Sequence, residues 1–464
     1  MSKKLATSPG LYIPDSEKSL AFEKVNTAGH WLALLPLLLF LSLFLGAGIY
    51  YSLQGADYAF YQLPAPVAVL PAIGLALYLA KGSLDQRIAI LLEGIGDSNI
   101  IAMCLIYLLA GAFAALTGVI GAIDSVVNFG LYWLPSGFVL PGLFIIAAVV
   151  SFAMGTSMGT LAALAPIGFG IAQSAGYEPA LVAGILLSGA IFGDNLSVIS
   201  DTSIAATRTQ GATVGDKLRQ NARWAIPAAL ITIVLFALTG SEQTQAETVD
   251  YQLYNLIPYA VIVTLALIGL NVFVILPVGI LVSILVGLAG SSFTMENTIA
   301  QTIYEGFSSM QEIFLLSLLI GGLGALMERQ GGLRWLVAKI SYLFAASKSA
   351  LGAQLAVLTT AAVTNLAVAN NTVSIILTAK VTRALADQGG LEAKRSASLV
   401  DIGACTTQGI LPYGAQCLLL GASFGISPLA PVQYAWYLPV LLGVVVLSLL
   451  IGNGFTFDRR INQQ

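Results

Sequence analysis

Long apolar runs alternate with short polar stretches along almost the whole chain. A helix needs about 20 apolar residues to cross a bilayer. We therefore predict membrane spans over residues 31–52, 64–80, 99–118, 180–202, 223–240, 254–270, 272–290, 312–328, 396–424 and 434–452. Polar stretches at 119–138, 203–222 and 291–311 are expected to be connections. The predicted fold is an all-α polytopic membrane protein with about ten transmembrane helices.

Two further apolar runs are too long for one span and are interrupted in the middle. The first, 139–175, is interrupted at 155–160, and the second, 349–386, is interrupted at Asn370-Asn371-Thr372. Irregular backbone at membrane depth is tolerated only where it is buried in protein or lines a wet cavity. We predict that each run is a re-entrant hairpin whose tip lies inside the protein.

The two halves of the chain repeat each other. The sequence numbers of Thr160 and Thr372 differ by 212 (372 − 160), and so do those of Trp224 and Trp436 (436 − 224). Each half then contains five spans and one hairpin, and an odd number of spans inverts the second half relative to the first. Inverted repeats with broken helices are typical of secondary transporters, whose site lies near the midplane where the halves meet.

This pattern divides the chain into five parts. The two repeats and their special elements are repeat 1 at 30–240, with hairpin 139–175 and broken helix 180–202, and repeat 2 at 254–452, with hairpin 349–386 and broken helix 396–424. The remaining parts are a cytoplasmic N-terminal arm at 1–29, an external linker at 241–253 and a cytoplasmic tail at 453–464.

Composition and charge fit this topology. Of the 464 residues, 57% are hydrophobic and 9% are charged, and the mean hydropathy is +0.87, which is typical of a membrane protein. The predicted topology places all 20 Lys and Arg residues on one side of the membrane. Because cytoplasmic loops carry an excess of Lys and Arg, both termini are expected in the cytoplasm. The expected partner is the lipid bilayer, and no nucleic acid is expected.

Residues 193–202, with the sequence GDNLSVISDT, place acidic and polar side chains at the end of an apolar run. Polar groups at membrane depth are costly and usually line a pathway. Carboxylate, amide and hydroxyl oxygens are the ligands that hard cations such as Na+ prefer. The candidate ion-binding residues are Asp194, Asn195, Ser197, Ser200, Asp201 and Thr202. We expect Asp194 to be the deeper Na+ ligand, at which Na+ and a proton compete.

Further polar side chains lie at the hairpin tips and in the second broken helix. They form a candidate site for a substrate or a second ion: Thr156, Ser157, Thr160, Asn365, Asn370, Asn371, Thr372, Thr406, Thr407 and Gln408. At a sequence offset of 214, Gln408 stands where the first half has Asp194 (408 − 194). The acidic groups therefore belong to one half only, although the tips and the broken helices of both halves are expected to converge.

Structural roles remain open for the same residues. Asp201 could cap its helix or pair with Arg208, Asp194 could be a buried hydrogen-bonding group, and the Ser and Thr hydroxyls could satisfy broken backbone. Asp401 lies beside two basic residues, so we expect it to be paired with them or solvated at the inner surface. No basic residue is expected in the core.

Residues 193–202 closely resemble the G-D-x-x-S-x-x-S-D-T signature of NhaC-type sodium/proton antiporters, and Ser188-Gly189-Ala190 is similar to the same family. The resemblance extends loosely over most of the chain. It implies membership of a wider ion-transporter superfamily, in which a transport region moves against a scaffold as an elevator. The transport region would comprise roughly 87–210 and 299–424. Asn195-Leu196 and Val198 differ from the usual residues of the signature. These differences weaken the antiporter assignment more than the predicted fold.

Two functions are compatible with these features. The first is a Na+/H+ antiporter that exchanges its ions at Asp194. The second is a sodium- or proton-coupled carrier of a small organic solute, either an amino acid or a carboxylate. An enzyme is not expected, because no catalytic set of residues is present, and no cofactor is expected besides the transported or coupling ions. We expect a multi-pass protein of a prokaryotic inner membrane and, by analogy with other elevator carriers, a homodimer.

Overall fold

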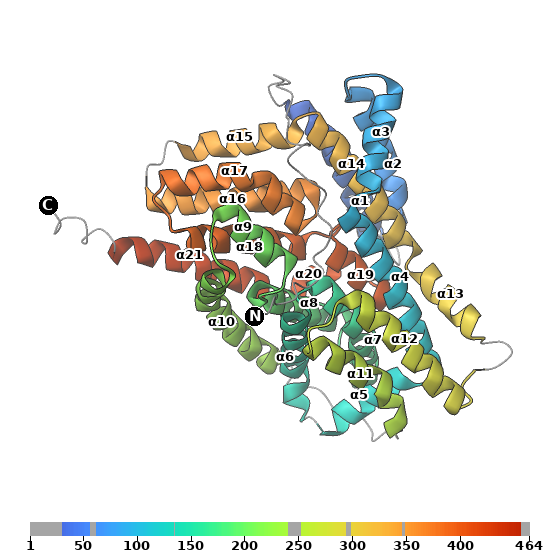
Figure 1. Ribbon diagram of the computed structural model, residues 1–464. Coiled ribbons are helices and arrows are strands. Elements are labelled where there is room, and N and C mark those ends of the chain that lie inside the picture. Colours follow the sequence, from blue (N-terminus) through green and yellow to red (C-terminus); the bar gives the residue numbers. More distant parts are fainter. Residues whose placement is uncertain are drawn as a thin grey trace, which may run out of the picture.

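The computed structural model describes residues 30–55, 62–133, 135–239, 252–293, 298–345 and 349–455. Within these ranges the regular secondary structure is entirely helical (Figure 1). The predicted arm at 1–29, residues 241–251 of the linker and residues 456–464 of the tail lie outside the described residues.

Nine helices in the described ranges are long and apolar enough to cross a membrane. They are α1 (Leu35–Leu53), α4 (Ser98–Val119), α6 (Ser136–Met154), α7 (Ser157–Ala175), α8 (Pro179–Leu196), α10 (Val214–Thr239), α12 (Val272–Ala289), α14 (Gln311–Arg329) and α16 (Ala350–Val368). Shorter apolar helices occupy three other predicted spans: α2 (Ala65–Leu79), α11 (Ile257–Leu267) and α21 (Tyr437–Phe455). The prediction of an all-helical polytopic membrane protein is confirmed.

Each predicted hairpin consists of two consecutive helices that turn at the predicted interruption. The first hairpin is α6 and α7, and its turn contains Gly155 in the left-handed conformation (φ 68°). The second is α16 and α17 (Asn371–Gln388), with Ala369 left-handed at the turn (φ 52°). A Cβ atom at residue 155 would lie 2.6 Å from Cγ1 of Ile199, so the first tip also approaches the polar motif closely.

Both predicted broken helices are interrupted. In the first half of the chain, α8 ends at Leu196, and α9 (Asp201–Gln210) begins after a non-helical stretch at 197–200. In the second half, α18 (Ala393–Ile410) is separated from α19 (Ala415–Phe424) by residues 411–414. The first broken helix therefore continues beyond the predicted end at residue 202.

The three predicted polar connections contain helices, and the loop expected over 203–222 is largely helical. Residues 203–222 belong to α9 and to the start of α10, while α5 (Ala122–Trp133) and α13 (Ile299–Ser309) lie in the other two stretches. Helix α5 packs against α7, and α13 packs against α4. Helices α5 and α13 are amphipathic and bury one face only. Their sequences therefore contain too many polar residues to be recognised as membrane spans. Three further helices complete the connections and the C-terminal part: α3 (Leu84–Ile95), α15 (Gly332–Ala345) and α20 (Ala430–Tyr434).

Close packing of small residues holds the hairpins to the broken helices. Helix α6 packs against α8, and α16 packs against α18 (Figure 1). A Cβ atom at Gly193 of α8 would lie 2.2 Å from the carbonyl oxygen of Ala148 in α6. A Cβ atom at Gly403 of α18 would lie 2.5 Å from the carbonyl oxygen of Leu358 in α16. Glycine lets helix backbones approach closely in membranes, and here it sets the depth of each hairpin tip beside its helix break.

Candidate ion-binding site

A cavity of about 250 Å³ lies where both hairpin tips and both helix breaks meet. Ten of the predicted site residues line it: Thr156, Ser157, Asp194, Ser200, Asp201, Thr202, Asn370, Asn371, Thr372 and Gln408. The starts of α4 and α12 contribute Asn99 and Asn271, and α19 contributes Gln416. Sequence reasoning missed these three amides, because isolated polar residues at helix starts are common and carry no motif.

Asp194 lies near the end of α8 and is 4% exposed. Its Oδ2 accepts a hydrogen bond from the hydroxyl of Ser157 at the first hairpin tip, at 3.1 Å. The hydroxyl of Ser200 is close enough to interact electrostatically with this carboxylate. Its hydrogen bond, at 2.9 Å, is to the hydroxyl of Thr202. Oδ1 of Asp194 is buried and accepts no hydrogen bond from the described residues. Because buried acceptors are normally satisfied, this oxygen is available to a cation or a proton.

A chain of amide hydrogen bonds connects the second helix break to Asp194. Nε2 of Gln408 donates to Oε1 of Gln416 at 3.1 Å, and Nε2 of Gln416 donates to the hydroxyl of Ser157 at 3.2 Å. Ser157 in turn donates to Asp194. Oε1 of Gln408 has no hydrogen-bond partner among the described residues. Two residues of the cavity wall, one from each broken helix, therefore each contain a buried oxygen without a hydrogen-bond partner among the described residues.

Three predicted residues of the first repeat face away from the cavity. Nδ2 of Asn195 donates to the hydroxyl of Tyr437 at 3.5 Å. The hydroxyl of Ser197 accepts from the backbone N–H of Ile199 at 3.4 Å, and that of Thr160 donates to the Thr156 carbonyl at 2.9 Å. For Ser197 and Thr160 the structure favours the backbone-satisfying role.

Three predicted residues of the second repeat lie behind the cavity wall. Nδ2 of Asn365 donates to the Ala404 carbonyl at 2.7 Å and to Oδ1 of Asn371 at 3.0 Å. Asn365 thus joins α16 to α18 and positions one lining amide. Thr406 and Thr407 are buried in α18 (2% and 7% exposed) without lining the cavity.

The second aspartate of the motif differs from the first in its environment. Asp201 lies in the first turn of α9, on the cavity wall, and is exposed. It forms none of the ion pairs present in the described part of the chain, so a pair with Arg208 does not occur there. Asp194 is therefore the buried acid of the motif and Asp201 the accessible one.

Asp401 forms an ion pair, as expected, but not with the basic residues beside it in the sequence, and it is not at the surface. Asp401 is fully buried in α18, and its Oδ2 lies 2.7 Å from Nζ of Lys217, which is also buried (0% and 1% side-chain exposure). The neighbouring Lys394 pairs instead with Glu392 at 2.7 Å, and Arg395 donates to Gln354. A basic residue thus lies in the core, contrary to the sequence analysis.

Lys217 was expected in a connection because residues 203–222 were predicted to be a polar connection rather than helix. Helix α10 begins at Val214 rather than near 223, and its first turns bury Lys217 and Asn221. Residues 217, 221 and 224 lie on one helical face, because they are spaced four and three apart. Extending the helical period of the span backwards into the polar stretch would have found this face.

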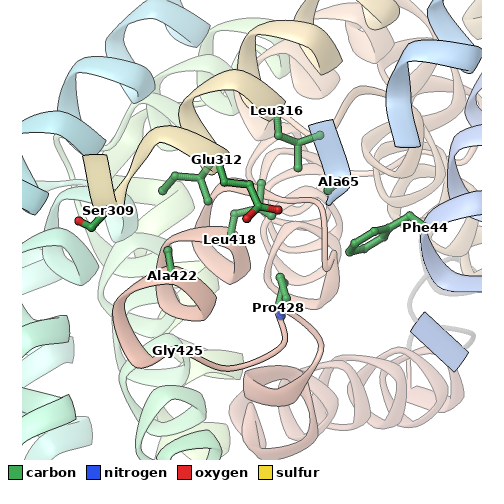
Figure 2. A pocket seen from close by; sticks show the side chains of 10 residues that line it. Phe44, Ala65, Ser309, Glu312, Leu316, Leu418, Ala422, Gly425 and Pro428 are labelled. Carbon is green, nitrogen blue, oxygen red and sulfur yellow. The ribbon is translucent and has the colours of Figure 1, made fainter. Parts of the chain in front are cut away.

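A second cavity, of about 300 Å³, lies away from the predicted site residues. Figure 2 shows Glu312 of α14 with its carboxylate directed into this cavity, opposite Phe44 of α1 and near Pro428. The other lining side chains are mostly apolar, including Leu316 and Leu418. This cavity contains one acidic group and none of the candidate ion-binding residues.

The oxygen ligands of the first cavity are of the kind that hard cations prefer. Its free acceptors are a carboxylate and an amide oxygen, supported by hydroxyls. Within the described ranges, no three His, Cys, Asp or Glu residues are placed to hold a metal ion together. The site can hold a cation or a proton at Asp194 and has amides for polar contacts to a larger solute.

Sequence comparisons identify the family. The profile of the Na+/H+ antiporter family matches residues 14–241 and 247–453, so the chain belongs to this family of transporters. The resemblance to NhaC-type antiporters is confirmed. The chain is 25% identical over 438 residues to the malate-2H(+)/Na(+)-lactate antiporter of Bacillus subtilis, covering 86% of this chain and 92% of that protein. It is 26% identical over 430 residues to the Na(+)/H(+) antiporter NhaC of the same organism, covering 83% and 90%.

Solved structures also align with most of the chain. The YdaH transporter of Alcanivorax borkumensis aligns with 90% of this chain and 99% of its own, at 15% sequence identity and a TM-score of 0.42.

Proposed function

We propose that this protein is a Na+/H+ antiporter that exchanges its ions at the carboxylate of Asp194. The observation that carries the proposal is that Asp194 lines the cavity and that its buried Oδ1 has no hydrogen-bond partner among the described residues. A carboxylate can hold Na+ or a proton, and each excludes the other. Movement of the loaded site between the two sides, with either ion bound, produces exchange. Gln408 is proposed as a second Na+ ligand through its free Oε1.

The proposed architecture is a pair of inverted repeats. Helices α6, α7, α8 and α9 begin at positions 136, 157, 179 and 201, and α16 to α19 begin at 350, 371, 393 and 415, so the sequence offset is 214 for every pair (for example 350 − 136). A cross-helix bond recurs at the same offset: Ser151 donates to the Ala190 carbonyl, and Asn365 donates to the Ala404 carbonyl. This correspondence supports the two repeats and, with them, an elevator whose transport region is 87–210 and 299–424.

The proposed topology assigns a side to each cavity. With all Lys and Arg loops in the cytoplasm, Asn99 and Asn271 stand at cytoplasmic helix ends, so the Asp194 cavity would open inward. Glu312 stands at the outer end of α14, at a sequence offset of 213 from Asn99 (312 − 99), and lines the other cavity. We infer that the cavity in Figure 2 is the outer counterpart of the site and that Glu312 faces it from outside.

The alternative function is a coupled carrier of a small organic solute. The size of the cavity favours it. A cavity of about 250 Å³ has room for a solute larger than a single ion. Its amides, Asn370, Asn371 and Gln416, could bind the carboxylate of an amino acid or organic acid. One relative of similar length is a malate and lactate antiporter.

A transport assay separates the two functions. The full-length protein is purified and reconstituted into liposomes that contain a pH-sensitive dye, and a Na+ gradient is imposed. Proton flux driven by Na+ alone, and lost in Asp194→Asn, is expected for the antiporter. No flux until malate, lactate or an amino acid is added would contradict the antiporter proposal and favour the solute carrier.

A further inference from the structure

The Lys217–Asp401 pair lies directly behind the break in α8. Besides Asp401 at 2.7 Å, Nζ of Lys217 donates to the hydroxyl of Ser203 at 2.6 Å and to the carbonyl oxygen of Asn195 at 3.2 Å. Nδ2 of Asn221 donates to the same carbonyl at 2.8 Å and to Oδ2 of Asp401 at 3.0 Å. The ammonium is thus satisfied by three oxygens and connects α8, α9, α10 and α18.

The carbonyl that these donors hold belongs to the residue next to Asp194. The last carbonyls of a helix lack N–H partners inside the helix, and a cation near this end is favourable. Because α8 stops at Leu196, the Asn195 carbonyl has this need at a depth where water is scarce. Lys217 and Asn221 satisfy it and thereby fix the backbone that carries Asp194.

A second link runs from Asp401 to the cavity wall. Sγ of Cys405 lies 3.7 Å from Oδ1 of Asp401 and 3.8 Å from Oγ1 of Thr202, which lines the cavity. The ion pair is therefore joined to the site on both sides, through Asn195 to Asp194 and through Cys405 to Thr202.

The pair has no counterpart in the other half, although the helix break does. Lys217 corresponds to Leu429 at the sequence offset of 212 and to Pro431 at 214 (217 + 212 and 217 + 214), and Asp401 corresponds to Leu187 at 214 (401 − 214). The second break, between α18 and α19, forms without a buried ion pair among its described contacts. A broken helix of this fold therefore does not require such a pair. The pair occurs only beside the half that carries the buried carboxylate.

We propose that Lys217 and Asp401 are positioning residues for the ion site, an inference that rests on the proposed exchange at Asp194. The ammonium of Lys217 holds the broken end of α8, Asp401 holds the ammonium, and together they fix the Asp194 carboxylate on the cavity wall. Neither residue contacts the transported ion. Loss of either charge should weaken Na+ binding more than it slows the maximal exchange rate.

The test uses full-length variants in detergent and in liposomes, with Na+ as the probe and K+ as the salt control. The variants are Lys217→Met, Asp401→Asn, the double variant, and the conservative Lys217→Arg. The Na+ concentration at half-maximal thermal stabilisation reports binding, and the KM and maximal rate of Na+-driven proton flux report transport. Removing groups that orient a metal ligand typically costs about 10- to 100-fold in affinity, so both single variants should raise these Na+ values about tenfold or more.

The double variant separates positioning from mere stability. Removing one partner of a buried pair is strongly destabilising, whereas replacing both is often tolerated. We expect the double variant to regain thermal stability without Na+ but to keep the raised KM. Lys217→Arg retains the charge and should raise the KM less than Lys217→Met does.

Three results would overturn the inference. One is a wild-type KM in Lys217→Met, and another is a double variant that regains both stability and Na+ affinity. If the wild type itself is not stabilised by Na+, the proposed function fails first and the inference falls with it. Asn221→Ala supplies a fallback should the charge variants not fold, since it removes one bond to the Asn195 carbonyl and one to Asp401 while both charges of the pair remain. An unchanged KM in Asn221→Ala would then contradict the positioning role.

Discussion

The hydroxyl of Ser157 donates a hydrogen bond of 3.1 Å to Oδ2 of Asp194, across 37 residues of sequence. This bond joins the tip of the first hairpin to the end of a broken helix. It leaves the second carboxylate oxygen of Asp194 without a partner among the described residues. The hairpin thus orients the carboxylate while one oxygen remains available to an ion.

Replacing Asp194 with Asn should abolish Na+-driven proton flux to the level of empty liposomes, because the amide can carry neither the proton nor the charge that holds Na+. Asp201→Asn should retain flux, since Asp201 is exposed whereas Asp194 is buried. Both are measured by dye quenching at equal amounts of reconstituted protein. Equal loss in the two variants would contradict the assignment of Asp194 as the exchanging acid.

Replacing Ser157 with Ala should raise the KM for Na+ about tenfold, because a hydrogen bond to a charged group contributes about 1.5–3 kcal/mol. The matched control is Ser151→Ala, which removes a hydroxyl of the same hairpin that bonds to the Ala190 carbonyl and does not line the cavity. Sodium titrations of proton flux give both values. The same KM in the two variants would show that Ser157 does not orient the carboxylate.

Replacing Gln416 with Ala should raise the KM for Na+ by about threefold to tenfold, because it breaks the amide chain between Gln408 and Ser157 and each neutral bond contributes about 0.5–1.5 kcal/mol. Gln210→Ala is the control, as Gln210 is a buried amide that bonds to Thr382 and Ser396 away from the cavity. A larger rise of the KM in Gln210→Ala than in Gln416→Ala would show that the amide chain does not support Na+ binding.

Replacing Gly193 with Ala should destabilise the protein by about 1–3 kcal/mol, because overpacking forces neighbouring backbone apart. The added Cβ would lie 2.2 Å from the Ala148 carbonyl oxygen, which belongs to α6. Gly443→Ala is the control, since a Cβ there meets no atom within 4 Å. Thermal unfolding in detergent measures both, and equal midpoints would disprove the close contact of α6 with α8.

Replacing Glu312 with Gln should raise the KM for Na+ supplied from outside, about threefold or more, and leave the KM for Na+ from the cytoplasmic side unchanged. The reason is that Glu312 is the acidic group of the cavity assigned to the outer face. Right-side-out and inverted membrane vesicles provide the two measurements. Glu305→Gln, an exposed acid bonded to Gln301, is the control. An effect from both sides would contradict the assigned orientation.

The sequence could predict the elements that the membrane dictates. Lipid demands apolar runs of defined length, so the spans and the interrupted runs at 155–160 and 370–372 were recognisable, and both interruptions are helix breaks. Polar groups are costly at that depth, so residues 193–202 stood out and led to the family, which the comparisons confirm. The ion-binding roles of these residues stay predictions.

Only the tertiary structure decided which polar groups meet. Asp401 and Lys217 are far apart in the sequence, and no local pattern shows that they pair. Gln416 and Asn99 carry no motif, yet they line the cavity, whereas Asn195 lies in the motif and turns away. Composition and period determine which segments are helical and buried, because burial in lipid acts on each segment separately. The direction of each side chain and its partner depend on how the helices pack against one another.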